Sequence, residues 1–167
     1  MDNVFKYGWM PWRYPRNWWG NIKLAFRQWK WAYQRATRGF ADCDTWNMDQ
    51  WLLSILSGAL NQLADNHWGW PGDSRFPKDE DWTQYLKDMA QKFYNANEAN
   101  EAYPTPERDK WWKWLEEHDY KILNFNRDDN PYVQTMLDED KEISNKRMQD
   151  FAEVWSMMGD VIWDLWD

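Results

Sequence analysis

The sequence predicts an all-α fold, a compact bundle of about five helices with a tryptophan-rich core and a long C-terminal helix. Apolar residues recur at spacings of three and four in several stretches, which is the period of a helix with one buried face. No stretch shows the alternation of a β-strand. Although the mean hydropathy is −1.02, the 17 Trp, 8 Tyr and 7 Phe are ample core material. Each buried ring removes roughly 150–250 Å² from water.

The first part of the chain is expected to be an aromatic arm followed by a long helix. At 167 residues the chain suits a single helical domain, residues 1–167. Residues 1–17 combine Gly and Pro with Trp9, Trp12 and Tyr14, so we expect an irregular arm that lays its rings on the domain. The helix that follows, over 18–38, carries one apolar stripe that should face the core: Trp18, Ile22, Ala25, Phe26, Trp29, Ala32 and Tyr33.

A second stripe of the same helix is basic. The polar residues that share its period are Lys23, Arg27, Lys30, Gln34 and Arg38. Such a ridge is either a solvated helix face or a surface for an anionic ligand, and the sequence leaves both interpretations open.

The next helix is expected to be the central one. Gly39 is the residue type that ends helices, and Asp44 or Thr45 is expected to cap the helix that runs on to Asn66. Its inward residues are expected to be Met48, Trp51, Leu52, Ile55, Leu56, Ala59, Leu60 and Leu63. A turn over 68–72 then leads to a third helix over 78–97, with these residues inward: Trp82, Tyr85, Leu86, Met89 and Phe93.

The remainder is predicted as a connector, a short helix, a loop and a long helix. Residues 98–105 form the connector, and Thr105 with Pro106 marks a helix start. Residues 124–131 form a polar loop, and the last helix runs from about 131 to 165. Its apolar residues step by three and four as in a coiled coil: Met148, Phe151, Trp155, Met158, Ile162 and Leu165. This seam packs either on the domain's own helices, which we favour, or on a second copy as a homo-oligomer.

Composition narrows the class of protein. The net charge of −8 is unevenly distributed, because residues 1–40 carry eight Lys or Arg and one acid, Asp2. The single cysteine, Cys43, allows no intramolecular disulfide and favours a reducing compartment. The sequence shows no signal peptide and no apolar run of the roughly 20 residues that span a membrane. We therefore expect a cytoplasmic protein without a membrane contact, and nucleic acid is disfavoured as a partner by the negative charge.

Catalysis finds no positive support in the motifs. Asp42, Asp44 and Asp49 cluster at a helix junction. Either they bind a divalent cation, or Asp44 caps a helix while Asp42 or Asp49 pairs with Arg35 or Arg38. His118 and Asp119 resemble part of a metal phosphohydrolase set, but they stand in a very polar segment. We therefore predict no catalytic residue, no metal ligand and no cofactor. A metal-dependent nucleotide hydrolase and a structural oligomer remain as alternative functions.

One stretch resembles a known group of proteins. Residues 38–49 read Arg-Gly-Phe-Ala-Asp-Cys-Asp-Thr-Trp-Asn-Met-Asp, and His-Trp-Gly-Trp-Pro follows at 67–71. This order resembles a recurrent group of small tailed-phage accessory proteins, in which an Arg-Gly-aromatic turn precedes an Asp-x-Trp-Asn-x-Asp helix and a His-Gly-aromatic-Pro turn. The ending, Trp-Asp-Leu-Trp-Asp at 163–167, is also similar to theirs. The group has no settled activity, so the resemblance implies a phage protein in an infected bacterium.

The functional hypothesis is a binding protein without catalysis. Phage accessory proteins of this size often bind a host component, so we expect either an anionic, nucleotide-type ligand, such as a host immune signalling nucleotide, or a host protein bound to counter defence. For a nucleotide, Arg and Lys side chains would contact phosphate, Trp side chains would stack on the base, and Asp would accept hydrogen bonds. The candidate binding residues are Lys23, Arg27, Arg35, Arg38, Asp44, Trp46, Asp49, His67 and Trp68.

Overall fold

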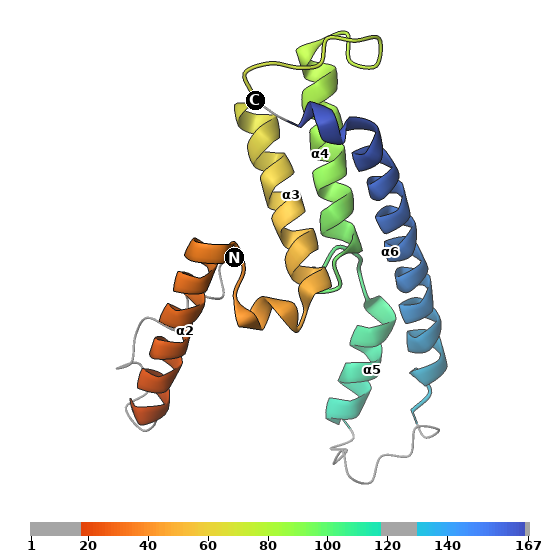
Figure 1. Ribbon diagram of the computed structural model, residues 1–167. Coiled ribbons are helices and arrows are strands. Elements are labelled where there is room, and N and C mark those ends of the chain that lie inside the picture. The colour runs from red at the N-terminus through yellow and green to blue at the C-terminus, as the bar shows by residue number, and fades with distance from the viewer. Residues whose placement is uncertain (1–17, 118–129, 166–167) are drawn as a thin grey trace. The chain divides into compact units, whose positions relative to one another are not determined.

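The computed structural model describes residues 18–117 and 130–165, and every regular element within them is helical. The helices are α2 (Trp18–Arg38), η3 (Asp42–Thr45), α3 (Met48–Asn66), α4 (Asp79–Ala96), α5 (Pro106–Glu117), α6 (Val133–Val161) and η6 (Ile162–Asp164), as Figure 1 shows. The predicted all-α class is confirmed, including the long C-terminal helix. The predicted arm over 1–17 and residues 124–129 of the predicted loop lie outside the described residues.

The chain, predicted as a single helical domain, divides into two compact units. Unit 1 is residues 1–51, with α2, η3 and the first turn of α3, and unit 2 is residues 52–167. The clustered buried residues that the structure describes all belong to unit 2. Unit 2 is therefore the part of the protein with a conventional apolar core.

The end of α2 is as the sequence predicts. Gly39 has a φ of 84°, a left-handed conformation that favours glycine, and its N–H donates to the Arg35 carbonyl at 3.0 Å. This is the pattern of a helix C-terminus closed by glycine. It turns the chain out of α2 and toward η3.

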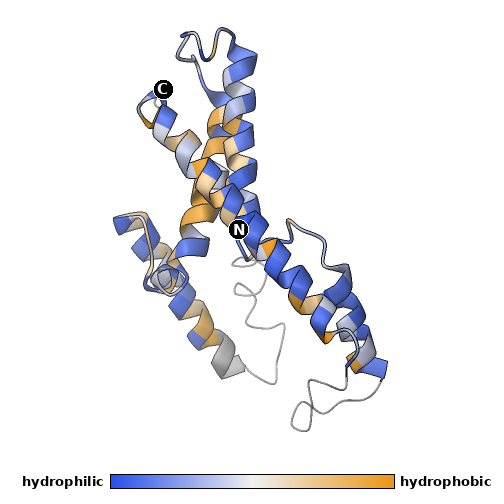
Figure 2. Ribbon diagram, turned by 90° about the vertical axis from the view of Figure 1, so that its right-hand side faces the viewer, coloured by the Kyte–Doolittle hydropathy of each residue, from blue (hydrophilic) through white to orange (hydrophobic). Residues whose placement is uncertain are grey.

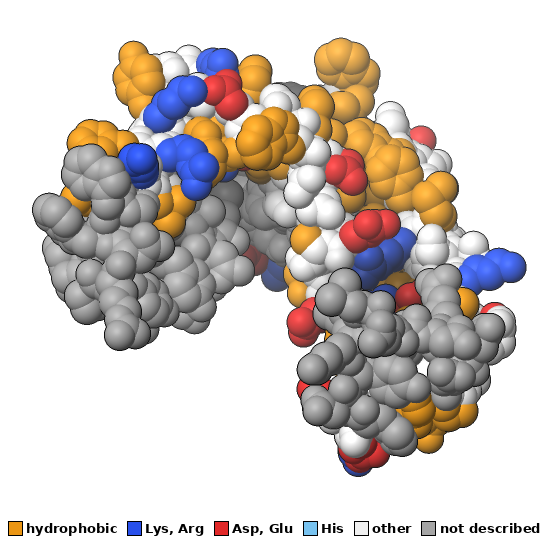
Figure 3. Space-filling model, turned by 90° about the horizontal axis from the view of Figure 1, so that it is seen from below, with side chains coloured by type: hydrophobic (Ala, Val, Ile, Leu, Met, Phe, Trp, Pro, Cys, Tyr) orange, Lys and Arg blue, Asp and Glu red, His pale blue; other side chains and the backbone are white. Residues whose placement is uncertain are grey.

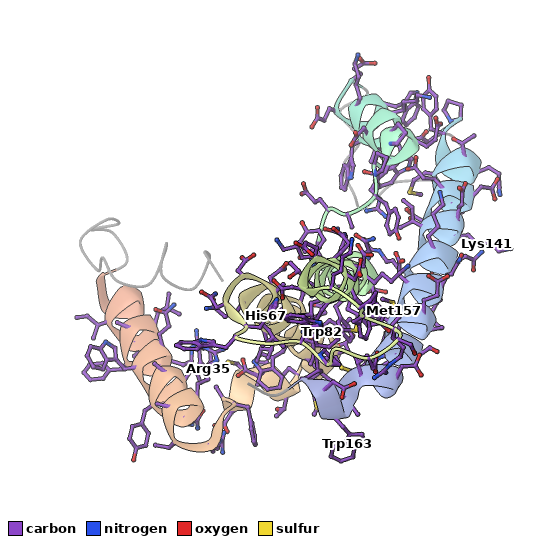
Figure 4. All side chains as sticks on the ribbon, turned by 90° about the horizontal axis from the view of Figure 1, so that it is seen from above. Arg35, His67, Trp82, Lys141, Met157 and Trp163 are labelled. Carbon is purple, nitrogen blue, oxygen red and sulfur yellow. The ribbon has the colours of Figure 1, made fainter. Side chains whose placement is uncertain are left out.

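The core of unit 2 is formed chiefly where α4 packs against α6. In α4 the predicted residues Trp82, Leu86, Met89 and Phe93 are all buried. They face Val154, Met158 and Val161 of α6, and Figure 4 shows Trp82 and Met157 in the middle of this contact. The helices run antiparallel, since Lys92 pairs with Asp150 at 3.3 Å while Tyr85 donates to the Met157 carbonyl at 3.1 Å.

The third core helix, α3, buries a face that overlaps the predicted one only in part. Its buried residues are Leu53, Ser57, Leu60 and Ala64; of the predicted stripe, Leu60 is buried and Leu56 and Leu63 pack against the core cluster. The Ser57 hydroxyl joins α3 to α4 by donating to the Ala90 carbonyl at 2.8 Å. Because α3 is apolar on most of its surface, periodicity could not select this face.

The start of α5 is capped by another helix. Pro106 is the first residue of α5, as predicted. The Glu139 carboxylate of α6 accepts from the Glu107 and Arg108 backbone N–H groups, both at 3.0 Å. A carboxylate at this position satisfies two of the N–H groups that a helix start leaves without a partner. This contact fixes α5 on the N-terminal half of α6.

The predicted C-terminal seam packs on its own unit only in part. Met158 is buried, with 4% of its surface exposed, and Leu165 packs against the core cluster. The other four residues of the seam are exposed to larger extents: Met148 65%, Phe151 41%, Trp155 38% and Ile162 50%. Figure 2 shows that apolar and polar residues both lie along α6. The buried side of α6 is instead a neighbouring stripe that includes Val154 and Val161.

Trp82 is expected to carry a large share of the stability of unit 2. Among the described tryptophans, it is the one that lies in the buried core cluster, with 2% of its surface exposed. Trp82→Ala should lower the free energy of unfolding by about 3–5 kcal/mol, because it removes a large buried ring and leaves a cavity. Urea unfolding followed by circular dichroism measures this change.

The matched control is Trp68→Ala, since Trp68 is 97% exposed in the same unit. It should change the free energy of unfolding by no more than about 0.5 kcal/mol. Equal losses in the two variants would show that Trp82 is not part of the core.

Candidate functional site

Arg35 and the buried Asp44 form a partly exposed ion pair at the junction of α2 and η3. The Arg35 Nε donates to Asp44 Oδ2 at 3.0 Å and its Nη2 donates to Oδ1 at 2.5 Å. Asp44 has only 7% of its surface exposed and also accepts from the Ala41 backbone N–H at 2.7 Å. The hydrogen bonds from Arg35 hold the pKa of Asp44 below its usual range. Asp44 therefore stays ionised and fixes Arg35 in place.

A second carboxylate, Asp42, gathers three side chains of α2. It accepts from Gln34 at 2.8 Å, pairs with Lys30 at 3.0 Å and is bound by the Arg38 guanidinium. The hydrogen bonds from Gln34 and then from Arg38 hold the pKa of Asp42 well below its usual range. Of the pairings that the sequence offered, the one between Asp42 and Arg38 is confirmed, whereas Arg35 pairs with Asp44 instead of Asp42 or Asp49.

The expectation that Asp44 or Thr45 caps the central helix is wrong. The helix α3 begins at Met48, and both residues lie in the preceding η3. The Asp44 carboxylate caps the start of η3 by binding the Ala41 N–H, and Thr45 donates to the Asp42 carbonyl at 2.8 Å. A short 3-10 helix stands in place of the expected first turn, and within it Asp44 accepts from both Arg35 and the Ala41 N–H.

The other candidate residues of unit 1 lie at the surface. Lys23 and Arg27 are exposed on α2, and the Arg27 guanidinium lies 5.2 Å from the centre of the Trp31 ring. Trp46 is 81% exposed, and Asp49 is exposed in the first turn of α3. The basic ridge of α2 is thus divided: Lys30, Arg35 and Arg38 contact carboxylates, whereas Lys23 and Arg27 have no ion pair with any described residue.

His67 and Trp68 belong to unit 2. The His67 Nδ1 lies 2.9 Å from the Gly69 carbonyl and its Nε2 lies 2.9 Å from the Thr83 hydroxyl. The side chain is only 6% exposed, so His67 attaches the turn after α3 to α4. Trp68 is 97% exposed. The expected convergence of these two residues with the candidate residues of unit 1 stays a prediction.

An aromatic face of α2 was missed as a binding surface. Phe26, Trp29 and Tyr33, here called the aromatic face, are exposed to 75%, 65% and 71%. They follow one another at i, i+3 and i+7, so they share one side of the helix. Ala25, Phe26 and Trp29 line an open hollow of about 350 Å³. Figure 3 shows hydrophobic and basic side chains side by side in this region.

The sequence placed these three aromatic residues in the core, and that expectation is wrong. Within the described part of unit 1, Ala41 is the only buried apolar residue. Periodicity shows that a helix has an apolar side, but it does not show whether the fold covers that side. The signal that could have identified the surface is the row of basic residues beside it, namely Lys23, Arg27 and Lys30.

The described residues contain neither a cluster of metal ligands nor a helix that could cross a membrane. Among them, no three His, Cys, Asp or Glu side chains gather as metal ligands would. His118 and Asp119 lie outside the described residues. No described helix combines the length and the apolar character that crossing a bilayer requires.

Comparison with known proteins does not assign the chain to a family. No protein-family model matches it, and no curated protein or solved structure is significantly similar to it. The geometry of the described residues is therefore the basis for any functional proposal.

The Arg35–Asp44 pair should stabilise the junction locally. Asp44→Ala removes the acceptor of the Ala41 N–H and the partner of Arg35, and hydrogen bonds to charged groups contribute about 1.5–3 kcal/mol. Hydrogen exchange of the Ala41 amide, measured by NMR, should therefore accelerate by roughly 10- to 150-fold. The control Asp42→Ala alters a half-exposed carboxylate and should change this rate by about twofold at most.

The same pair predicts a dependence on pH. The pKa of Asp44 is lower in the folded state, so its contribution is present above the unfolded pKa of about 3.9 and is lost as the pH falls below it. Protection of the Ala41 amide should thus fall as the pH drops below about 3.9 in the wild type and not in the Asp44→Ala variant. Equal pH profiles would contradict the assignment.

Proposed function

We propose that this chain is a non-catalytic binding protein whose α2 helix inserts the aromatic face into an apolar groove of a partner protein. One observation carries the proposal: three large aromatic side chains, each at least 65% exposed, lie on one side of a helix. Anchors at i, i+3 and i+7 are the spacing with which an amphipathic helix binds a hydrophobic groove. Exposed aromatic clusters beside charged residues mark interaction surfaces in proteins generally.

The energetics of the aromatic face suit a protein partner. Trp and Tyr are enriched among the residues that dominate binding, and each such anchor contributes about 2 kcal/mol or more. The open hollow beside Phe26 and Trp29 offers space for a side chain of the partner. A single helix with three anchors can therefore supply specific binding without any chemistry.

The charge of α2 indicates the rim of the partner's groove. The helix contains no acidic residue, and Lys23 and Arg27 are exposed within one turn of Phe26. Acidic side chains around an apolar groove would complement these two cations, which would raise the association rate more than the affinity. We therefore expect a partner surface that is apolar at its centre and acidic at its edge.

The contacts of Arg35 and Arg38 favour a protein partner over a nucleotide. Both guanidinium groups already bind carboxylates, and an incoming phosphate would meet the ionised Asp42 and Asp44 at the same place. A phosphate that displaced Asp44 from Arg35 would leave a carboxylate that is only 7% exposed without its cation, which is costly. The resemblance to phage accessory proteins supports a host protein as the partner, in the cytoplasm of an infected bacterium.

Truncation of the aromatic face should abolish partner binding. The chain, as wild type and as Phe26→Ala/Trp29→Ala/Tyr33→Ala, serves as bait in lysate of a candidate host, and the captured protein is purified for titration. The triple variant should bind at least about 100-fold more weakly, because it loses several anchors of about 2 kcal/mol each. Trp46→Ala, which truncates an 81% exposed side chain of the same unit, should bind like the wild type.

Two results would contradict this proposal. One is equal partner binding by the triple variant, shown to be folded by circular dichroism. The other is a thermal shift of roughly 2.7 kcal/mol with a nucleotide at a hundredfold excess over its Kd that Arg35→Glu/Arg38→Glu removes and the triple variant keeps. The second result would establish the nucleotide hypothesis instead.

The expected acidic edge of the partner's groove is tested by reversing two charges on α2 while the aromatic face stays intact. Lys23→Glu/Arg27→Glu should slow association with the captured partner by about 10-fold or more at low salt and should leave the dissociation rate nearly unchanged. Surface plasmon resonance at several salt concentrations measures both rates. An association rate that is independent of this change would show that the partner's rim is not acidic.

A further inference from the structure

Residues 98–117, here called the strap, contain no buried residue. The strap consists of the connector that follows α4 and the whole of α5, and each of its residues is half-buried or exposed. The helix α4, which precedes it, has six buried residues among its 18. Because apolar burial stabilises a fold in proportion to the area removed from water, the strap adds little to the stability of unit 2.

One buried residue fixes the start of the strap. Asn97 directly follows α4, and 0% of its surface is exposed. Its side-chain amide donates to the Ser54 hydroxyl of α3 at 2.8 Å and accepts from the Ala99 N–H at 3.0 Å. These contacts hold the chain on α3 at the point where it leaves α4. Asn97 is therefore a fixed point from which the strap can move.

The helical part of the strap is held by two carboxylates of α6. Glu139 accepts from the first backbone N–H groups of α5, and Asp140 pairs with the Arg108 guanidinium at 2.5 Å. Both carboxylates are half-buried, and the Arg108 side chain is 44% exposed. Water can therefore replace these contacts at a modest cost when α5 moves away. Figure 1 shows α5 alongside the N-terminal half of α6.

The connector is held on α6 by two further contacts. The Tyr103 hydroxyl donates to the Asp150 carboxylate, and the Asn100 carbonyl accepts from the Arg147 guanidinium at 3.3 Å. Asp150 also pairs with Lys92 of α4 at 3.3 Å. Release of the connector therefore does not leave Asp150 without a cation, which would be costly for a group that is only 14% exposed.

The covered side of α6 changes in character along the helix. In the C-terminal half it consists of Val154, Met158 and Val161, which all belong to the core cluster. In the N-terminal half the buried apolar residues are Met136 and Ile143, which lie outside that cluster. The two carboxylates that hold α5 stand between them in the sequence. The contact between α6 and the strap is thus a small one, separate from the core.

We infer that the strap opens from α6 as one unit while the core of α3, α4 and the C-terminal half of α6 stays folded. Segments with few buried apolar contacts open at a smaller free energy than the whole domain. Opening uncovers Ile143, since this residue lies between the residues of α6 that bind α5 and those that bind the connector. The inference concerns unit 2 and does not depend on the binding role proposed for α2.

The first test is amide hydrogen exchange of the full chain under native conditions, measured by NMR. The amides of α5 should exchange at least about 100-fold faster than those around Met89 in α4, because they need only the local opening. Trp82→Ala should accelerate exchange in α4 and leave the rates in α5 within about twofold, since Trp82 belongs to the core cluster. Amides of α5 that exchange as slowly as those of α4, and accelerate with them, overturn the inference.

The second test weakens the contact between α6 and α5. Glu139→Ala removes the acceptor of two backbone N–H groups and should accelerate exchange in α5 by at least about 10-fold, with the rates in α4 unchanged. Glu142→Ala is the matched control, because this carboxylate of the same helix is 69% exposed and pairs with Lys146. It should leave exchange in α5 unchanged. The inference fails if Glu139→Ala leaves α5 unchanged or accelerates α4 equally.

The third test measures access to the covered side of α6. In a Cys43→Ser background, Ile143→Cys places a thiol under the strap and Val154→Cys places one in the core. The thiol of Ile143→Cys should react with a maleimide at least about 100-fold faster, because the strap opens more often than the core unfolds. Adding Glu139→Ala should accelerate only this reaction. Equal rates at the two positions, in variants that circular dichroism shows to be folded, overturn the inference.

Discussion

The packing of α4 against α6 is the contact on which the described structure of unit 2 depends. It joins segments about sixty residues apart, with Trp82 and Phe93 on one side and Val154 and Val161 on the other. Polar contacts at its edge fix the register: Lys92 binds Asp150 and Glu153, and Asp150 also accepts from Tyr103. That contact, together with burial, raises the pKa of Tyr103 to about 12, so the phenol keeps its proton and its hydrogen bond at neutral pH. The helices α3 and α5 are then placed by contacts to this pair.

The described part of unit 1 is held together mainly by ion pairs rather than by an apolar core. Among its described residues the buried ones are Ala41 and Asp44, and carboxylates of η3 hold the C-terminal half of α2 through Arg35, Arg38 and Lys30. A unit arranged by charge needs little apolar burial of its own, and its aromatic side chains are then available at the surface. The same carboxylates already bind Arg35 and Arg38, two cations that a phosphate-binding site would need. The basic ridge therefore has two parts: Lys30, Gln34 and Arg38 contact Asp42, whereas Lys23 and Arg27 are exposed.

The contrast between the apolar core of unit 2 and the ion pairs of unit 1 bears on the proposed binding function. The proposed partner surface on α2 is an apolar stripe that the described residues leave exposed. Its anchors at i, i+3 and i+7 lie beside Lys23 and Arg27, which form no ion pair with a described residue, and this combination fits an apolar groove with an acidic edge.

The sequence by itself determined the helical class, the bounds of α2 from Trp18 to Arg38, the start of α5 at Pro106 and the inward residues of α4. These features depend on short-range chemistry: periodicity, a glycine that tolerates positive φ, and a proline at a helix start. The pairing of Asp42 with Arg38 was predictable for the same reason, because the two residues are four positions apart in the sequence. Only the tertiary structure decided which side of each helix is covered. In α3 and α6 more than one side is apolar, and in α2 the one apolar stripe is exposed among the described residues. Which side is buried depends on the segments that pack against the helix. Phe26 and Met148 therefore lie at the surface, and no local pattern encodes that outcome.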